Sequence, residues 1–152
     1  MPDTPNAANR RQPTLLYVVK QVELAVRARL DEILRPAGIS ALQYTALTVL
    51  ERHPDLSSAQ LARNSFVTAQ SMADMVVTLQ GCGLIDRHRD ADDRRRLVLA
   101  LTPQGQKLLS RYRPKVAAIE EEMLSTLTAR QATELRRSLS ACRAALAEHP
   151  PR

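Results

Sequence analysis

Arginine side chains are concentrated in one short stretch of this sequence. Positions 87–96 hold five arginines and three aspartates, namely Arg87, Arg89, Arg94, Arg95 and Arg96 with Asp90, Asp92 and Asp93. Guanidinium groups bind phosphates and enter narrow A·T-rich minor grooves, where the negative potential is enhanced. One or two of the aspartates could brace a guanidinium by bidentate pairing. The stretch therefore predicts contact with DNA, with a solvated, self-neutralised loop of salt bridges as the alternative.

The three aspartates could instead indicate a metal site. An EF-hand loop that begins at Asp90 needs Gly at its sixth position and Glu at its twelfth, where this sequence has Arg95 and Leu101. The histidines and cysteines show no His-x-x-x-His or Cys-x-x-Cys spacing, and there is no Gly-x-Ser-x-Gly motif. We therefore expect no metal, no cofactor and no enzymatic activity, which disfavours a nuclease or a hydrolase.

A second set of polar residues is spaced to share one face of a helix. Thr68 can cap a helix over 68–80, whose buried face carries Met72, Val76 and Leu79. Gln on the opposite face can read adenine bidentately, and Asp can accept from cytosine N4. Polar stripes are also ordinary on surface helices. The candidate DNA-binding residues are Ser57, Thr68, Gln70, Ser71, Asp74, Thr78, Arg87, Arg89, Arg94, Arg95 and Arg96.

The elements that must position these side chains follow from helix caps and breaks. Capping boxes at Ser40 with Gln43, and at Ser57 with Gln60, open two of the helices. We expect helices over 14–34, 40–53, 57–64, 68–80, 103–123 and 128–146, with a kink or a break at Pro114. Two short segments, 84–89 and 96–101, predict a β-hairpin, with Leu97, Leu99 and Leu101 alternating at period two.

This order predicts a mainly α protein with a winged helix-turn-helix lobe. The helices over 57–64 and 68–80 are joined by a tight connector, and the hairpin follows them as a wing. We divide the chain into a flexible tail (1–13), an N-terminal dimerisation helix (14–38), the DNA-binding lobe (39–101) and C-terminal dimerisation helices (102–148). Exposed apolar patches mark interfaces. The candidate dimer residues are Leu15, Leu16, Val19, Leu139, Cys142 and Leu146.

A series of short motifs runs through residues 57–105. They are Leu61-Ala62, Val67-Thr68, Met72, Leu79, Gly83-Leu84-Ile85, Arg87, the loop 90–95 and the segment 101–105. In this order they resemble the MarR family of bacterial transcriptional regulators. The most specific part is the Asp-x-x-Asp-Arg-Arg loop followed by Leu-Thr-x-x-Gly. The resemblance in element order extends over residues 14–147.

The resemblance implies a homodimer that binds pseudo-palindromic operators in double-stranded DNA. It also implies release by a small phenolic, lipophilic or oxidant signal, and it makes Arg94 the residue inserted into the minor groove. A ligand pocket would lie between the dimerisation helices and the DNA-binding lobe, with Tyr17, Tyr44, His53 and Phe66 as candidate residues. Many relatives carry Arg at the positions of Asp74 and Thr78, whereas residues 68–80 contain no basic side chain. Asp74 could instead pair with Arg63.

Composition agrees with a basic, DNA-binding chain. The 152 residues carry a formal net charge of +6 and are 44% hydrophobic, enough for one packed domain. No apolar run reaches the length of a membrane span, and residues 1–13 lack a signal sequence, so we expect a cytoplasmic protein without membrane contact. The two cysteines are expected to be buried, with Cys82 the better candidate for a thiol switch. A sequence-indifferent architectural DNA protein, or a winged helix that binds an acidic protein, remains the alternative function.

Overall fold

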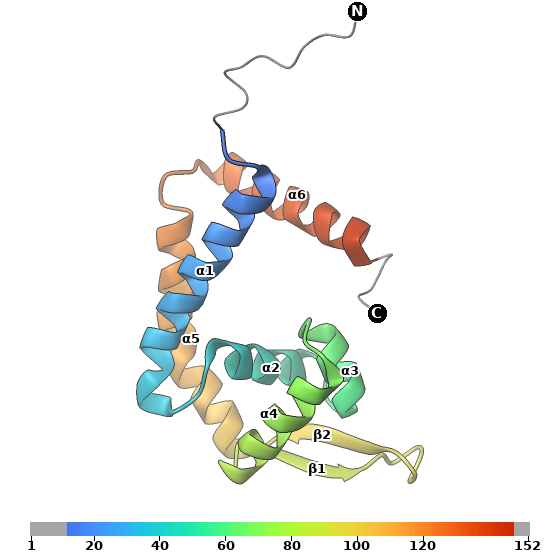
Figure 1. Cartoon of the computed structure of the whole chain (residues 1–152). Helices are drawn as coiled ribbons and strands as arrows, with labels where there is room; N and C mark the ends of the chain where they lie inside the picture. Colours follow the sequence, from blue (N-terminus) through green and yellow to red (C-terminus); the bar gives the residue numbers. More distant parts are fainter. Residues whose placement is uncertain (1–11, 148–152) are drawn as a thin grey trace, which may run out of the picture. The chain divides into compact units, whose positions relative to one another are not determined.

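The computed structural model describes residues 12–147 and is mainly helical (Figure 1). Its elements are the helices α1 (Leu15–Leu34), α2 (Ala41–Arg52), α3 (Ser58–Asn64), α4 (Ala69–Gly81), α5 (Pro103–Met123) and α6 (Ala129–Ala147), the 3-10 helix η2 (Arg35–Ala37), and the strands β1 (Ile85–Arg89) and β2 (Leu97–Leu101). The chain forms two compact units, one up to Pro114 and one from Lys115 onward. The predicted fold class is confirmed, whereas most of the predicted tail, residues 1–11, and residue 148 lie outside the described part.

The helices begin where side-chain caps can satisfy their first backbone N–H groups. The Ser40 hydroxyl accepts from the Gln43 N–H over 3.2 Å, and the Gln43 amide oxygen accepts from the Ser40 N–H over 2.9 Å. Ser57 forms the same box at the start of α3. A cap of this kind stabilises a helix by about 1 kcal/mol. These local contacts explain why the predicted helix starts are confirmed.

The core of the first unit is built from the apolar faces of its helices. Leu47 of α2, Leu61 of α3 and Leu79 of α4 are all 0% exposed. Truncating such a buried leucine to alanine costs about 2–5 kcal/mol. Tyr44 lies in the same core, and burial raises the pKa of its hydroxyl. The core holds the helix-turn-helix and the hairpin in one compact unit.

The hairpin is a two-stranded antiparallel sheet that pairs Ile85 with Leu101 and Arg89 with Leu97. The predicted alternation along β2 is wrong, because Leu97 is 44% exposed while the adjacent Val98 and Leu99 are both buried. β2 packs against α2, and Leu99 also forms an isolated bridge with Leu56. Both faces of β2 are therefore covered near its middle.

A close backbone contact joins the end of the hairpin to α5. The Thr102 hydroxyl donates to the Gly83 carbonyl over 2.6 Å and accepts from the Gly105 N–H over 3.1 Å. A Cβ on Gly105 would lie 2.3 Å from the Leu84 carbonyl oxygen. Only glycine fits at this approach, so the Leu-Thr-x-x-Gly motif fixes where α5 starts.

Helix α5 is continuous, and α6 begins at a side-chain cap. α5 runs through Pro114 without interruption, so the predicted break is absent, and the boundary between the two units falls directly after this residue. α6 begins at a cap in which Thr128 and Gln131 exchange hydrogen bonds of 2.9 and 3.1 Å. Among residues 12–147, no helix is both long and apolar enough to cross a membrane.

Candidate nucleic-acid interface

A tight helix end connects α3 to α4. The Val67 N–H donates to the Ala62 carbonyl over 3.1 Å, and the Phe66 N–H donates to the Arg63 carbonyl over 3.4 Å. Phe66 itself has a φ of 58°, in the left-handed region. These contacts form a Schellman motif, in which the residue after the helix cap takes a left-handed backbone. The motif sets the direction in which α4 leaves α3.

One face of α4 is buried and the other is polar, as predicted. Met72 and Leu79 are 0% exposed, whereas Gln70, Asp74 and Thr78 are exposed. The Gln70 amide donates to the Asp74 carboxylate over 3.3 Å, and the Thr78 hydroxyl donates to the Asp74 carbonyl over 3.2 Å. The outward face of α4 therefore offers amide and carboxylate groups, and it carries no cation.

The expected pairing of Asp74 with Arg63 is not observed. Among residues 12–147, the hydrogen bond that reaches the Asp74 carboxylate comes from Gln70. At the start of the helix, the Thr68 hydroxyl accepts from the Ser71 N–H over 3.1 Å and donates to the Ser71 hydroxyl over 3.0 Å. Thr68 and Ser71 thus cap α4, and both remain exposed at its N-terminus.

The aspartates of the wing hold its backbone. The Asp90 carboxylate accepts from the Asp92 N–H over 3.0 Å, and the Asp93 carboxylate accepts from the Arg95 N–H over 3.1 Å. The Arg89 guanidinium donates to the Arg94 carbonyl over 2.7 Å. Of the expected bracing of guanidinium groups by aspartate, the pair of Asp90 with Arg96 over 3.6 Å is present, without bidentate geometry, and the same carboxylates also order the loop itself.

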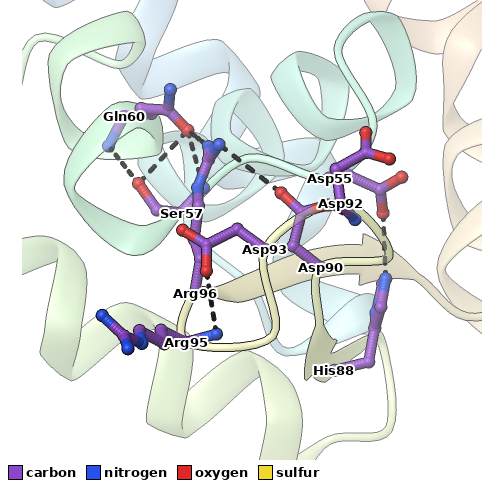
Figure 2. A network of polar contacts seen from close by, with 9 residues as sticks. All are labelled: Asp55, Ser57, Gln60, His88, Asp90, Asp92, Asp93, Arg95 and Arg96. Carbon is purple, nitrogen blue, oxygen red and sulfur yellow. Dashed lines mark hydrogen bonds and ion pairs between the residues drawn. The ribbon is translucent and has the colours of Figure 1, made fainter.

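Arg96 connects the wing to α3 (Figure 2). Its guanidinium donates to the Gln60 amide oxygen and lies 3.6 Å from the Asp90 carboxylate. The same Gln60 oxygen accepts from the N–H of Ser57, which begins α3. Arg96 was predicted to bind DNA, but its charged group is directed at the protein. The structure assigns Arg96 a positioning role in the wing, and Ser57 a capping role.

A second connection joins β1, near its tip end, to the loop before α3 (Figure 2). His88 Nε2 lies 3.0 Å from the Asp55 carboxylate, and Asp55 has a φ of 64°. Next to it, the Leu99 N–H donates to the Leu56 carbonyl over 2.8 Å. The wing is thus fixed to the helix-turn-helix through β1, through β2 and through Arg96.

Four arginines of the wing are exposed and have no acidic partner among residues 12–147, and one of them, Arg89, donates to the Arg94 carbonyl. Arg87, Arg94 and Arg95 are exposed, and none of the ion pairs within residues 12–147 uses their side chains. The loop backbone that carries Arg94 and Arg95 is hydrogen-bonded at both ends, by Asp90 and by Arg96. The wing therefore presents unpaired guanidinium groups on an ordered hairpin.

The four predicted ligand residues differ in exposure, and their role stays a prediction. Tyr44 is buried in the core, whereas Tyr17 is 56% exposed, Phe66 is 75% exposed and His53 is exposed at the end of α2. The first unit has a hollow of about 350 Å³ that none of the four lines. Its lining residues are Pro36, Ala37, Leu84, Gln104, Lys107, Leu108, Arg111 and Tyr112.

The predicted dimer residues are all exposed, each within its own unit. In α1, Leu15 and Leu16 are 76% and 81% exposed, and Val19 is 48% exposed. In α6, Leu139 is 48% exposed and Leu146 is 74% exposed. Their exposure agrees with the expected dimer role, which stays a prediction.

The expectation that the cysteines are buried is wrong. Cys82 and Cys142 are both free and exposed. Within the described ranges, no group of three His, Cys, Asp or Glu side chains is arranged to hold a metal ion.

The contacts that position the wing were not identified from the sequence. Capping-box spacing marked Gln60 only as a helix cap, and the partner of its side chain, Arg96, lies 36 residues away. Asp55 and His88 likewise meet across a long separation. No local pattern reports such contacts, whereas the arginine cluster itself was visible in the sequence.

Comparison with known proteins identifies this arrangement. Residues 37–96 match the MarR family. The HTH-type transcriptional repressor Rv2887 of Mycobacterium tuberculosis is 32% identical over 123 residues, which cover 81% of this chain and 88% of that protein. A crystal structure of Rv2887 in complex with salicylic acid has a TM-score of 0.70 at 31% identity and covers 88% of this chain and 98% of its own.

Two DNA complexes share the fold. The Staphylococcus aureus MepR–DNA complex has a TM-score of 0.79 at 23% identity and covers 89% of this chain and 100% of its own. The repressor CouR bound to a 23-mer DNA duplex has a TM-score of 0.73 at 27% identity and covers 86% of this chain and 92% of its own. The protein therefore belongs to the MarR family, and it is a DNA-binding transcriptional regulator.

Proposed function

We infer that the protein is a homodimeric repressor that occupies a pseudo-palindromic operator and blocks transcription there. In this proposal α4 lies in a major groove, and the tip of the wing, with Arg94 foremost, enters the neighbouring minor groove. Rv2887, which is 32% identical, is itself a transcriptional repressor. A regulator of this class acts where the chromosome lies, which in a bacterium is the cytoplasm.

The observation that carries the proposal is the ordered wing with unpaired arginines. Arg94 and Arg95 have no acidic partner within residues 12–147, while Arg96 and His88 anchor the hairpin that carries them. Unpaired guanidinium groups on a flexible loop would lose conformational entropy on binding. An ordered hairpin reduces that cost, so its charge is available for DNA.

The exposed apolar residues of α1 and α6 support a homodimer. On α1, Leu15, Leu16 and Val19 are exposed by 76%, 81% and 48%, and on α6 Leu146 is 74% exposed. Exposed apolar side chains gathered in this way mark interfaces. A twofold dimer places two recognition helices about one DNA turn apart, roughly 34 Å. The operator would then have two half-sites at that spacing.

The effector belongs to the class of small phenolic or lipophilic compounds. The support is the salicylic acid bound to Rv2887, a relative at 31% identity in that structure. A ligand that binds the free dimer better than the DNA-bound dimer shifts the equilibrium towards release. Tyr17, His53 and Phe66 are exposed enough to contact such a ligand in the dimer, whereas Tyr44 is a core residue.

Selection of bound genomic fragments tests the proposal. The dimer should retain a few fragments that share one inverted repeat, and its affinity should fall steeply with salt because phosphate contacts release counterions. Sodium salicylate should then release the labelled fragment in a titration. The lack of a cation on α4 favours the alternative of an architectural DNA protein, which would retain fragments of every sequence at equal affinity. A chain that binds no duplex at low salt would contradict both functions.

A further inference from the structure

A large apolar side chain lies on the outward face of α4. Val77 is 67% exposed, one helical turn from the exposed Asp74 and Ala73. It points away from the buried Met72 and Leu79, since these positions lie on the opposite side of the helix. Val77 is therefore near the centre of the face that the proposed function directs at the bases.

The polar neighbours of Val77 are already engaged with one another. The Gln70 amide donates to the Asp74 carboxylate over 3.3 Å, and the Thr78 hydroxyl donates to the Asp74 carbonyl over 3.2 Å. The Thr78 proton is consequently not available to a base. The methyl groups of Val77, on the same face, take part in no hydrogen bond.

The major groove offers one apolar group to such a side chain. Thymine carries a C5-methyl group there, and apolar protein atoms distinguish thymine from the other bases by contact with it. Single exposed valines are ordinary on protein surfaces. Val77 differs because it shares the outward face of a helix without a cation with Gln70 and Asp74, the candidate base-reading side chains.

We propose that Val77 specifies a thymine in each operator half-site by packing its methyl groups on the thymine C5-methyl. The inference rests on the proposed function, because it requires α4 to enter the major groove. It adds a recognition element that uses no hydrogen bond and no charge. A 5-methylcytosine at the same position would present the same methyl group and would replace thymine in part.

The test uses the full-length protein and an operator obtained by selection from a random duplex library. Each thymine of the half-site is replaced in turn by uracil, which removes only the methyl group. At one position in each half-site, the wild-type affinity should fall by about fourfold, the ratio expected for one apolar carbon lost from a contact. Val77→Ala changes both subunits of the proposed dimer, so it should bind the thymine operator more weakly by a similar factor for each half-site, and it should no longer distinguish thymine from uracil.

Thr78→Ala is the matched control on the same face. It should keep the full ratio between the thymine and uracil operators, and Val77→Ala should unfold at the wild-type temperature because its side chain is mostly exposed. A selected half-site without thymine would overturn the inference. Equal affinities for the thymine and uracil operators at every position would also overturn it. So would a preference for thymine that persists in Val77→Ala. In those cases the selected operator would still support the proposed function, whereas failure to select any sequence would count against both.

Discussion

The outward face of α4 and the tip of the wing are chemically opposite. α4 presents Gln70, Asp74 and Val77 and has no basic residue, whereas the wing presents Arg94 and Arg95 without acidic partners in the described chain. Phosphate and minor-groove contacts by cations dominate affinity, while contacts with base edges decide sequence. In the proposed complex the two regions would divide these tasks between them.

The division also has a cost at α4. The Asp74 carboxylate is exposed, and among residues 12–147 it accepts a hydrogen bond from the Gln70 amide. In the proposed complex this acidic side chain would lie near the DNA, where repulsion from phosphates would weaken binding to every sequence. The wing must offset this repulsion, and the arginines that it leaves unpaired are suited to do so.

The largest expected effect comes from removing charge at the wing. Arg94→Ala should weaken operator binding by about tenfold to hundredfold, since each subunit of the proposed dimer loses one cation from the minor groove. The slope of log affinity against log salt should become shallower by about 2, one for each subunit. Fluorescence anisotropy over a range of salt concentrations measures both quantities.

Arg130→Ala is the matched control for Arg94→Ala. It removes the same charge from α6, outside the winged lobe, and should leave the salt slope almost unchanged. Equal losses in the two variants would mean that net charge alone drives binding. That result would remove the distinction between the wing and the rest of the surface.

A charge reversal on α4 tests the other side of the comparison. Asp74→Arg should raise affinity for random duplex by about tenfold and steepen the salt slope, because repulsion is replaced by attraction. It should also change the preferred base at one position of each half-site. Glu32→Arg, the same charge change on α1, should do neither. An unchanged affinity for random duplex would show that Asp74 lies away from the DNA.

Substitution of Arg96 distinguishes a residue that positions the wing from one that contacts DNA directly. Because its guanidinium contacts Gln60 and Asp90, Arg96→Ala should lower the free energy of unfolding by about 1 kcal/mol, and the melting temperature by about 2–4 °C. Operator affinity should fall by about threefold to tenfold through loss of wing order. Arg94→Ala should leave the melting temperature unchanged. An Arg96→Ala variant with wild-type melting temperature and a large loss of affinity would place Arg96 on the DNA.

Much of the frame that carries both regions was predictable from local sequence. The caps at Ser40, Ser57 and Thr68 depend on residues three positions apart, and all three are confirmed. The burial pattern of α4 follows from helical spacing in the same way. Local rules sufficed here because each contact is made within one helical turn.

The contacts that order the wing were not predictable, because they depend on distant partners. From the sequence, Arg96 is indistinguishable from the other arginines of the wing, whereas in the structure its guanidinium contacts Gln60. Alternation along β2 failed for a related reason, since Leu56 approaches Leu99 from outside the hairpin. The left-handed backbone at Phe66 was also missed, because glycine or asparagine is the usual signal for it.

The smallest expected effect comes from a substitution in the turn between α3 and α4. It tests whether this turn only positions α4 and makes no contact with DNA. A left-handed backbone costs a non-glycine residue about 1–2 kcal/mol, and the 75% exposed Phe66 gains little from burial. Phe66→Gly should therefore raise the free energy of unfolding by about 0.5–1 kcal/mol after the larger entropy of the unfolded glycine is counted.

Gly83→Ala is the reverse control, just after the end of α4. There φ is 75° and the added Cβ would lie 2.8 Å from the Gln104 side chain, so this substitution should destabilise the fold. Urea unfolding gives both values, and operator affinity should stay at the wild-type level in Phe66→Gly. A loss of affinity in that variant would make Phe66 a third DNA contact, and the comparison between α4 and the wing would then be incomplete.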